Sequence, residues 1–567
     1  MRSSLNPSSP LVWITTIVLM GAAMGLFLFF REPPPEAHRD ARVRADRVIL
    51  ISLDTLRQDH MSLYGYPRPT TPNLDAFAKQ ATVFTNAMSQ APYTLPSHMT
   101  MMTGMHPLSH NVRYHQDRLA ENYVTIAERL KSSGFKTAGF TDGGFLEARH
   151  GFDAGFDEYD DKPQSGWVLN NGFRRRSQQL KDWVFKRQKD RFFLFFHTFD
   201  CHAPYVADEA SRAALAGTAP VVPARAREFP DPIARLKQFR IHDYMKLDQY
   251  ATIDQLVDEY DATIRFVDER LGDLLRSLEA MGLLDTALVI ITSDHGESFL
   301  DHGIYAGHGL TLYEEEVRVP LIVKFPGGRF AGVRNDDVVR LIDLYPTICA
   351  ACEVEAPAQI EGLDLEDALL DRDTEPRVAL GESPNLSDHS VPGLDSIMNY
   401  VRRENLKYID GCKIGVQTLM DGHLGKVAPG EPYYDLKNDP LGMKPVVIVT
   451  PQVYDLNSDP EEQKDVAPQQ QEMVERIKPR IKKQWDTALA IREVLTQGVK
   501  PAELEDTLEK LEQLVQQGYI SVADYERRKQ VLEMKQFQDE LDRKEREKQQ
   551  QDDGKTGPPP AESGSKR

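Results

Sequence analysis

Cysteine is scarce in this sequence. The 567 residues contain only four cysteines, Cys201, Cys349, Cys352 and Cys412, which is too few for a fold held together by disulfides. Cys349 and Cys352 form a C-x-x-C pair in the apolar segment LYPTICAACEV, and no second pair accompanies it. We therefore interpret both as small core residues of a helix rather than as a redox or zinc site.

The chain also lacks an excess of positive charge. It has 68 Lys and Arg against 87 Asp and Glu, a formal net charge of −19. Proteins that hold nucleic acid through its phosphates need basic surfaces. The balance therefore argues against a nucleic-acid partner, although net charge says little about fold.

Residues 11–30, LVWITTIVLMGAAMGLFLFF, contain no charged side chain. An apolar stretch of this length can cross a bilayer once as a helix. A cleaved signal peptide would have a shorter apolar core that ends in small residues, whereas here the apolar run continues past Ala22 and Ala23. We predict an uncleaved single-pass membrane anchor, preceded by a cytoplasmic N-terminus (1–10) and followed by a Pro-rich linker (31–45).

The middle of the chain alternates between apolar runs and helical patterns. The segments RVILISLDT, KTAGFTD, RFFLFFHT and TALVIITSDHG are typical of buried strands. TPNLDAFAKQATVF and residues 250–283 have helical patterns. Strands spaced by helices predict an α/β fold with a mostly parallel sheet covered on both faces.

The alternation of apolar and helical segments gives way to a different pattern towards the C-terminus. YDLKNDP at 434–440 is nearly repeated as YDLNSDP at 454–460, and we expect a small α+β subdomain, with a sheet and a terminal helix, over 398–495. Residues 501–548 resemble a short helical-hairpin tail, which could support self-association. The polar end, 549–567, is predicted to be disordered.

The segment YTLPSHMTMMTG at 93–104 combines a hydroxyl with a helix start. Pro96 has a preset φ and favours a first helical position, which leaves Thr94 beside the free N–H groups of the helix N-terminus. A hydroxyl beside an anion site can be a nucleophile, but an ordinary N-terminal cap has the same sequence. These residues alone leave both interpretations open.

Acidic and imidazole side chains follow two of the predicted strands. Asp54 ends the first strand, and Asp294 and His295 end TALVIITS. In a parallel sheet, ligands gather at the carboxyl ends of strands. Two carboxylates and an imidazole at one edge therefore predict a site for a divalent cation.

Nine sequence blocks resemble the sulfatase family of the alkaline-phosphatase superfamily. They occur in the family's order from residue 46 to about 490: ISLDT, PTTPNLDAFA, APYTLPSHMTMMTG, GFDAGFDEY, HTFDCHAPY, IITSDHGES, GHGLTLYEEEVRVPLIVKFPG, LIDLYPTI and VYDLNSDPEEQKDVA. The resemblance implies an alkaline-phosphatase-like fold, with a mixed, mostly parallel sheet flanked by helices. The catalytic domain would span 46–397.

The resemblance also implies roles for individual residues. Asp54, Asp294 and His295 would be ligands of one divalent metal ion (Ca, Mn, Zn or Mg). Thr94 stands at the nucleophile position, where its oxygen would also contact the metal.

Three histidines are placed by the same resemblance. His202 matches a histidine that contacts the substrate or protonates the leaving group. His308 stands where many sulfatases have a lysine that faces the transferred group. His302 lies nearby in the sequence but matches no family role, and we interpret it as an exposed loop histidine.

The departures from the family pattern bear on the reaction. Sulfatases oxidise Cys or Ser to formylglycine, and threonine cannot give that aldehyde because its β-carbon carries a methyl group. His98 replaces the arginine that steadies formylglycine, and Thr55 replaces a second ligand aspartate. A threonine alkoxide suits phosphoryl transfer. The two-metal phosphodiesterases of the superfamily need an Asp-x-x-x-His ligand pair, and no histidine here follows an aspartate by four residues, so the resemblance implies a single-metal site.

Three hypotheses remain open from the sequence. The first is a hydrolase or transferase that acts on phosphate mono- or diesters through Thr94. The second is a sulfuric ester hydrolase that does not use formylglycine, and the third is an inactive sulfatase-fold binding protein. The superfamily's usual location predicts a periplasmic or extracellular domain on a cell-membrane anchor, although the arginines after residue 30 favour the cytoplasm by the positive-inside rule.

Overall fold

The computed structural model describes residues 42–162, 172–238, 245–303, 306–383, 398–410, 451–497 and residue 529. The predicted anchor at 11–30 and the tail at 501–548, residue 529 apart, lie outside these residues, as do 1–10, 549–567 and all but the end of the linker. Within the described ranges, no helix combines the length and hydropathy that a membrane span requires.

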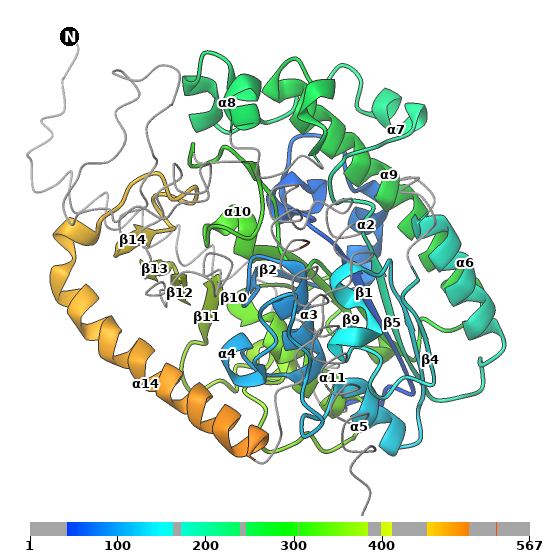
Figure 1. The fold of residues 1–567 in the computed structure, drawn as a ribbon. Coiled ribbons are helices and arrows are strands. Elements are labelled where there is room, and N and C mark those ends of the chain that lie inside the picture. Colours follow the sequence, from blue (N-terminus) through cyan, green and yellow to red (C-terminus); the bar gives the residue numbers. More distant parts are fainter. Residues whose placement is uncertain are drawn as a thin grey trace, which may run out of the picture.

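The main sheet has eight strands in the order β10-β2-β9-β6-β1-β5-β3-β4 (Figure 1). The strand β9 is antiparallel to both of its neighbours, and the other adjacent pairs are parallel. The predicted mixed, mostly parallel sheet is therefore confirmed. The strand bounds are β1 Arg47–Leu53, β2 Thr82–Met88, β3 Lys136–Phe140, β4 Glu158–Asp160, β5 Phe192–Thr198, β6 Ala287–Thr292, β9 Arg318–Lys324 and β10 Arg334–Arg340.

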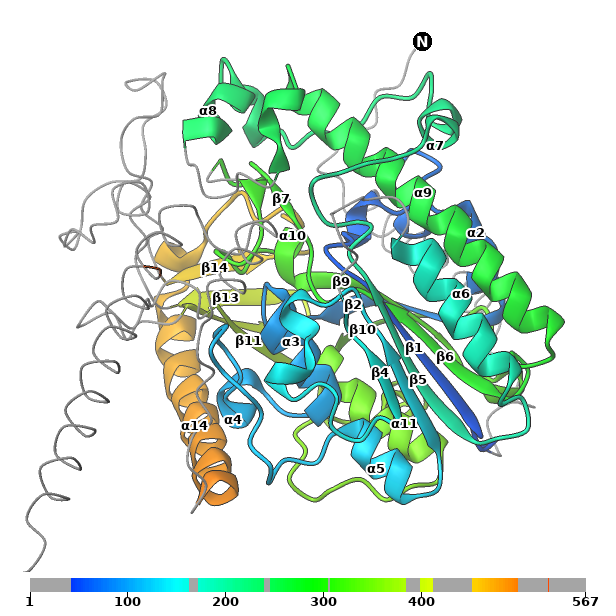
Figure 2. The same cartoon turned by 45° about the vertical axis from the view of Figure 1, so that its right-hand side comes forward.

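Helices cover both faces of this sheet, as Figure 2 shows. Successive residues of a strand point to opposite faces: Ile49 and Ile51 belong to one hydrophobic core, and Val48 and Leu50 belong to the other. The first core includes α2 (Pro72–Phe77), α6 (Gly172–Phe185) and α9 (Ile253–Ala280). The second includes α3 (Thr94–Thr103), α5 (Ile126–Ser132), α11 (Leu344–Ala351) and α12 (Leu365–Leu369).

The long helix α9 is the predicted helix of residues 250–283. Its apolar residues recur at helical spacing, and the Thr252 side chain accepts a hydrogen bond from the Gln255 N–H and so caps the N-terminus. The helical prediction for TPNLDAFAKQATVF was only partly correct. The helix α2 ends at Phe77, and the second half of the segment enters β2 because Val83 and Phe84 pair with β9 in the sheet interior.

Shorter elements connect these layers. They are α4 (Pro107–His110), α7 (Glu209–Ala214), α8 (Pro232–Gln238), α10 (Glu314–Val317) and the two-stranded sheet of β7 (Ser298–Phe299) and β8 (Ala306–Gly307). Cys349 and Cys352 are buried and unbonded to each other in and just after α11, in agreement with their interpretation as core residues.

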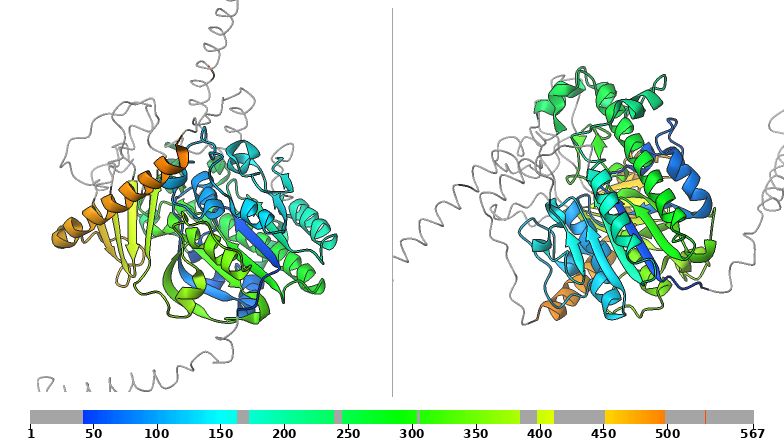
Figure 3. Two further views of the ribbon diagram at one scale, coloured as in Figure 1. Left: turned by 90° about the horizontal axis from the view of Figure 1, so that it is seen from below. Right: turned by 90° about the vertical axis from the view of Figure 1, so that its right-hand side faces the viewer.

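A second, antiparallel sheet lies beside the first and has the order β11-β12-β13-β14. Its strands are β11 (Val378–Ser383), β12 (Met398–Arg403), β13 (Leu406–Asp410) and β14 (Gln452–Asp455), and α14 (Gln471–Thr496) runs across it (Figure 3). The small C-terminal sheet with a terminal helix is thus present. Its first strand, β11, ends at Ser383. The second sheet therefore begins before residue 398, the subdomain boundary predicted from the sequence.

Buried ion pairs join the second sheet to the catalytic domain. Glu314 of α10 forms ion pairs with Arg402 of β12 and with Lys407 of β13, whose Nζ lies 3.0 Å from Glu314 Oε1. Lys407 Nζ also lies 3.0 Å from Oε1 of Glu462. All four side chains are buried, so removal of one partner would leave an uncompensated buried charge.

His302 belongs to this interface and is not the exposed loop residue that the sequence suggested. Its side chain is 7% exposed and stacks on Tyr313. Nδ1 lies 2.9 Å from Glu315 Oε1 and Nε2 lies 3.1 Å from the Glu462 carbonyl, an arrangement that uses both ring nitrogens as donors. Burial lowers the pKa of His302, but the charge and hydrogen bond of Glu315, with the charges of Glu462 and Asp301, together raise it to about 9.

We expect His302→Gln to destabilise the protein in a pH-dependent way. A histidine whose folded-state pKa lies above its unfolded value stabilises the fold fully below about pH 6.5. That contribution is lost as the pH rises through about 9. The melting temperature of the variant, measured by calorimetry, should be about 3 °C or more below wild type at pH 6.5 and close to wild type at pH 10.

The matched control is Lys482→Gln, which breaks an exposed ion pair with Asp486 and should change the melting temperature little at either pH. Equal destabilisation by His302→Gln at both pH values would contradict a charged His302.

Candidate active site

The central strands of the main sheet bring the predicted residues to one edge. The strands β6, β1 and β5 are neighbours and parallel, so their carboxyl ends meet. Asp54 follows β1, Asp294 and His295 follow β6, and His202 lies four residues beyond β5. All four side chains are at most 1% exposed.

Thr94 faces this edge from the first position of α3. The helix begins two residues earlier than Pro96 suggested, and its N-cap is Tyr93, which makes no side-chain cap. The Thr94 hydroxyl donates to Asp54 Oδ2 at 3.3 Å and lies 3.4 Å from His295 Nε2. The Thr94 hydroxyl therefore contacts Asp54 and His295, not the backbone of its own helix.

The strand-end cluster, formed by Asp54, Asp294 and His295, has the chemistry of a cation site. One ligand atom from each of Asp54, Asp294 and His295 lies within 4.8 Å of the others. Asp54 Oδ1 and Asp294 Oδ2 are buried and accept no hydrogen bond from the residues that the structure describes. His295 Nε2 lies 3.3 Å from Asp294 Oδ2 and 3.9 Å from Asp54 Oδ1.

Two buried carboxylates in contact with one another repel unless a proton or a cation separates them. Burial raises the pKa of Asp54 to about 7, and burial followed by the charge of Asp54 raises the pKa of Asp294. A divalent cation would favour the ionised form of both groups. Carboxylate oxygens and one imidazole, with the Thr94 hydroxyl beside them, fit a single such ion.

Two histidines form the wall opposite the carboxylates. The His308 ring lies with its centroid 4.4 Å from that of His295 and 5.0 Å from that of His202. Burial and the neighbouring His308 lower the pKa of His202 to about 3, and burial with His295 lowers the pKa of His308. Burial therefore favours the neutral form of both rings.

Glu297 is a member of the site to which the sequence assigned no role. Its side chain is fully buried; Oε1 lies 3.0 Å from His308 Nδ1, and Oε2 accepts a 2.9 Å hydrogen bond from the Tyr205 hydroxyl. A carboxylate on Nδ1 fixes the tautomer and orientation of a histidine. The available signal was the Glu that closes the quoted motif SDHGE.

His197 is a second residue that the sequence analysis missed. Its Nε2 lies 3.1 Å from Asp54 Oδ2, and its ring contacts that of His98 at 5.0 Å. His98 in turn lies 2.9 Å from the Thr94 carbonyl and 2.8 Å from Ser52 Oγ. A histidine near the carboxyl end of the otherwise apolar strand FFLFFHT was the signal that could have revealed it.

We expect the purified full-length protein to bind one divalent cation per chain and Asp54→Asn to lose it. The amide keeps the shape of the carboxylate but removes one of the two charges that would balance the ion. Metal content after dialysis, measured by mass spectrometry, should fall to background in the variant, with affinity reduced about 100-fold or more.

Asp301→Asn is the matched control, because Asp301 pairs with Arg57 away from the cluster; it should retain the ion. A wild type that carries no ion after exposure to Ca²⁺, Mn²⁺, Zn²⁺ and Mg²⁺ would rule the site out.

Comparison with known proteins agrees with this architecture. The Sulfatase family model matches residues 46–354. The chain is 24% identical over 355 residues to an ulvan-active sulfatase of Formosa agariphila, a match that spans 58% of this chain and 66% of that protein. It is 26% identical over 392 residues to the multifunctional alkaline phosphatase superfamily protein PehA of Trinickia caryophylli, covering 56% of this chain and 76% of the relative.

The fold is also that of solved members of the superfamily. A phosphonate monoester hydrolase of Agrobacterium radiobacter superposes with a TM-score of 0.59 at 18% identity, covering 79% of this chain and 96% of that structure. The family model, the sheet order and the clustered strand-end residues lead to one conclusion: this chain belongs to the sulfatase family, within the alkaline-phosphatase superfamily of ester hydrolases.

Proposed function

We propose that this ester hydrolase acts on phosphate mono- or diesters, as a metal-dependent hydrolase or transferase, through the Thr94 hydroxyl. The observation that supports the proposal is the position of Thr94 Oγ1, 3.3 Å from Asp54 Oδ2 and 3.4 Å from His295 Nε2. The hydroxyl is buried and lies at the start of a ten-residue helix, where backbone N–H groups favour an anion.

The residue type at this position favours phosphoryl transfer. Formylglycine expels sulfate through the second hydroxyl of its hydrated aldehyde, and threonine has no route to that group. A phosphothreonine needs no such assistance, because water or an acceptor alcohol can attack its phosphorus directly.

In the first step the Thr94 oxygen forms a bond to phosphorus while the bond from phosphorus to the leaving oxygen breaks. The hydroxyl proton passes to Asp54 Oδ2, which already accepts its hydrogen bond. A bound divalent cation, held by Asp54, Asp294 and His295, would supply Lewis acidity to the transferred group.

His202 is the proposed donor to the leaving oxygen. Its Nδ1 lies 2.5 Å from the Ala203 carbonyl, which holds the ring in place. Burial disfavours the imidazolium, but the negative charge of a bound ester acts in the opposite direction. In the second step, water attacks phosphorus and the bond to the Thr94 oxygen breaks. The Thr94 oxygen takes back the proton held by Asp54, and His202 takes a proton from the water. A monoester substrate then releases phosphate, and a diester releases a phosphate monoester.

A sulfuric ester is the second candidate substrate, supported by the sulfatase among the relatives. The same hydroxyl and the same histidines could accept a sulfuryl group, although return of the threonine sulfate to free enzyme would require attack of water at sulfur. A side-by-side assay separates the two candidates.

We expect Thr94→Ala to abolish turnover of aryl phosphate mono- and diesters, with kcat reduced roughly a thousandfold or more. Thr94→Ser keeps the hydroxyl and should remain within about tenfold of wild type. Steady-state assays of aryl phosphates, phosphodiesters and sulfates on the three proteins provide the measurement.

Equal activity of wild type and Thr94→Ala would place the nucleophile elsewhere. Turnover of the aryl sulfate alone would favour the second candidate.

Glu297→Gln should lower kcat roughly tenfold to a hundredfold with little change in KM, because the amide no longer fixes the His308 ring by a charged acceptor. The control is Tyr205→Phe, which removes the other hydrogen bond of the carboxylate and leaves the contact with His308; its effect should be a few-fold at most. A drop in melting temperature with unchanged kcat would instead make Glu297 a purely structural residue.

A further inference from the structure

A histidine occupies a core position near the end of β5. Phe193 and Phe195 point into the second hydrophobic core, and the alternation of a strand places His197 on the same face. Its side chain is fully buried. A third phenylalanine would suit this position, whereas burial of an imidazole costs free energy unless its polar atoms are paired. The residue type is therefore better explained by the hydrogen bond that the ring makes than by packing.

The strand register places this ring beside Asp54. The strand β5 is parallel to β1, with His197 opposite Ser52, and His197 Nε2 lies 3.1 Å from Asp54 Oδ2. Because an ionised carboxylate can only accept, Nε2 carries the proton and donates the hydrogen bond. Nδ1 is buried and has no hydrogen bond within the described part of the chain. Asp54 is thus the one hydrogen-bond partner of the ring among those residues.

The two oxygens of Asp54 have different surroundings. Oδ2 accepts hydrogen bonds from His197 Nε2 and, at 3.3 Å, from the Thr94 hydroxyl. Oδ1 is buried without a hydrogen bond from any described residue and lies 3.9 Å from His295 Nε2 in the candidate cation site. His197 itself is not one of the clustered ligand groups. Its hydrogen bond can therefore act on the cation site only through Asp54.

The His197 ring is held in place by two other rings. The His98 ring meets it edge to face with the centroids 5.0 Å apart, and the Phe199 ring does so at 4.7 Å. His98 is itself fixed, since its Nε2 lies 2.8 Å from Ser52 Oγ and its Nδ1 lies 2.9 Å from the Thr94 carbonyl. These contacts keep the imidazole from turning away from the carboxylate.

We propose that His197 is a positioning residue that orients the Asp54 carboxylate. Its N–H holds Oδ2 beside the Thr94 hydroxyl and leaves Oδ1 for the cation. Hydrogen bonds to metal ligands fix the direction of those ligands, and loss of one typically lowers metal affinity about 10- to 100-fold. Only the part of Oδ2 as acceptor of the Thr94 proton rests on the proposed function; the orientation of Oδ1 for the cation does not.

The test compares two variants of the full-length protein. His197→Phe keeps a planar ring of similar size and removes the donor, whereas His197→Gln keeps an N–H donor of similar reach. His197→Phe should bind Mn²⁺ about 10- to 100-fold more weakly than wild type in isothermal titration calorimetry. Its kcat for an aryl phosphate should fall about tenfold or more, with KM changed less than about threefold. His197→Gln should stay within about fivefold of wild type in both measurements.

Phe193→Leu is the matched control. It perturbs the same core on the same strand but removes no hydrogen bond to the cation site. It should lower the melting temperature by about 3 °C or more and leave the Mn²⁺ affinity unchanged.

The proposal is overturned if His197→Phe binds Mn²⁺ as tightly as wild type, because Asp54 would then need no donor to keep its orientation. Equal losses of affinity in His197→Phe and His197→Gln would assign the effect to the shape of the ring, and absence of Mn²⁺ binding by wild type would remove the site on which His197 acts. If wild type turns over no phosphate ester while His197→Phe still loses Mn²⁺ affinity, the proposed function fails and the orientation of Asp54 by His197 is supported.

Discussion

The constraint on which the site depends is the meeting of two buried carboxylates at neighbouring strand ends. Asp54 and Asp294 are both fully buried, and each has an oxygen without a hydrogen-bond donor among the described residues. Desolvation of two like charges is costly unless a cation compensates it. The parallel pairing of β1 with β6 creates this arrangement, and Thr94, His295 and His197 are then packed around it.

Imidazoles stand where the family pattern has cations. By the resemblance, His98 would replace the family's arginine, and His308 would replace the lysine found in many sulfatases. Histidines lose their charge readily in a buried site, and both ring nitrogens of His98 are already paired, with Ser52 Oγ and the Thr94 carbonyl. In the proposed reaction, the N-terminus of α3 and a bound cation would balance most of the charge of the transferred phosphoryl group. In that reaction Glu297 would orient His308, whose Nδ1 lies 3.0 Å from Glu297 Oε1.

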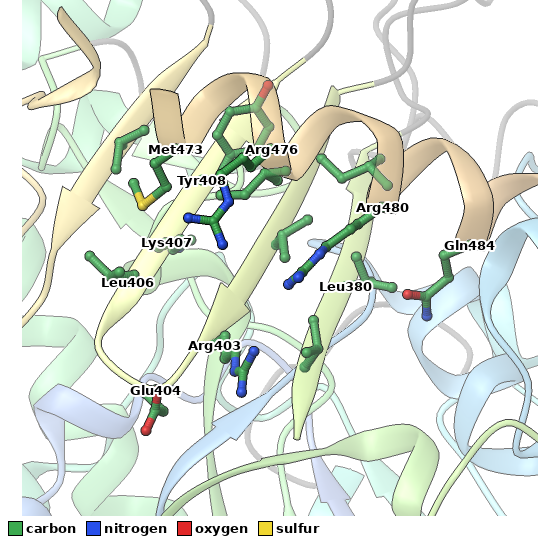
Figure 4. A pocket seen from close by; sticks show the side chains of 15 residues that line it. Leu380, Arg403, Glu404, Leu406, Lys407, Tyr408, Met473, Arg476, Arg480 and Gln484 are labelled. Carbon is green, nitrogen blue, oxygen red and sulfur yellow. The ribbon is translucent and has the colours of Figure 1, made fainter. Parts of the chain in front are cut away.

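The second sheet meets its two environments through different chemistry. Its inner face is fixed by the buried charges of Arg402, Lys407 and Glu314, with His302 beside them. Such pairs add specificity of position more reliably than stability. Its outer face packs against α14, where Met473, Ile477 and Ile481 lie against the cluster that contains Tyr408 and Val453 (Figure 4).

The sequence by itself determined the family, the mixed sheet and the edge at which Asp54, Asp294 and His295 gather, because strand patterns and motif order are local properties. It also indicated Thr94 as a candidate nucleophile, although a helix N-cap has the same local sequence pattern. Only the tertiary structure shows that the Thr94 hydroxyl points to Asp54 and that His302 is buried. It also brings His197 and Glu297 into the site. Those outcomes depend on contacts between segments far apart in the chain, such as Asp54 with His197 and His302 with Glu462. No local pattern encodes which distant side chain will complete a hydrogen bond, so that information appears only when the sheet is assembled.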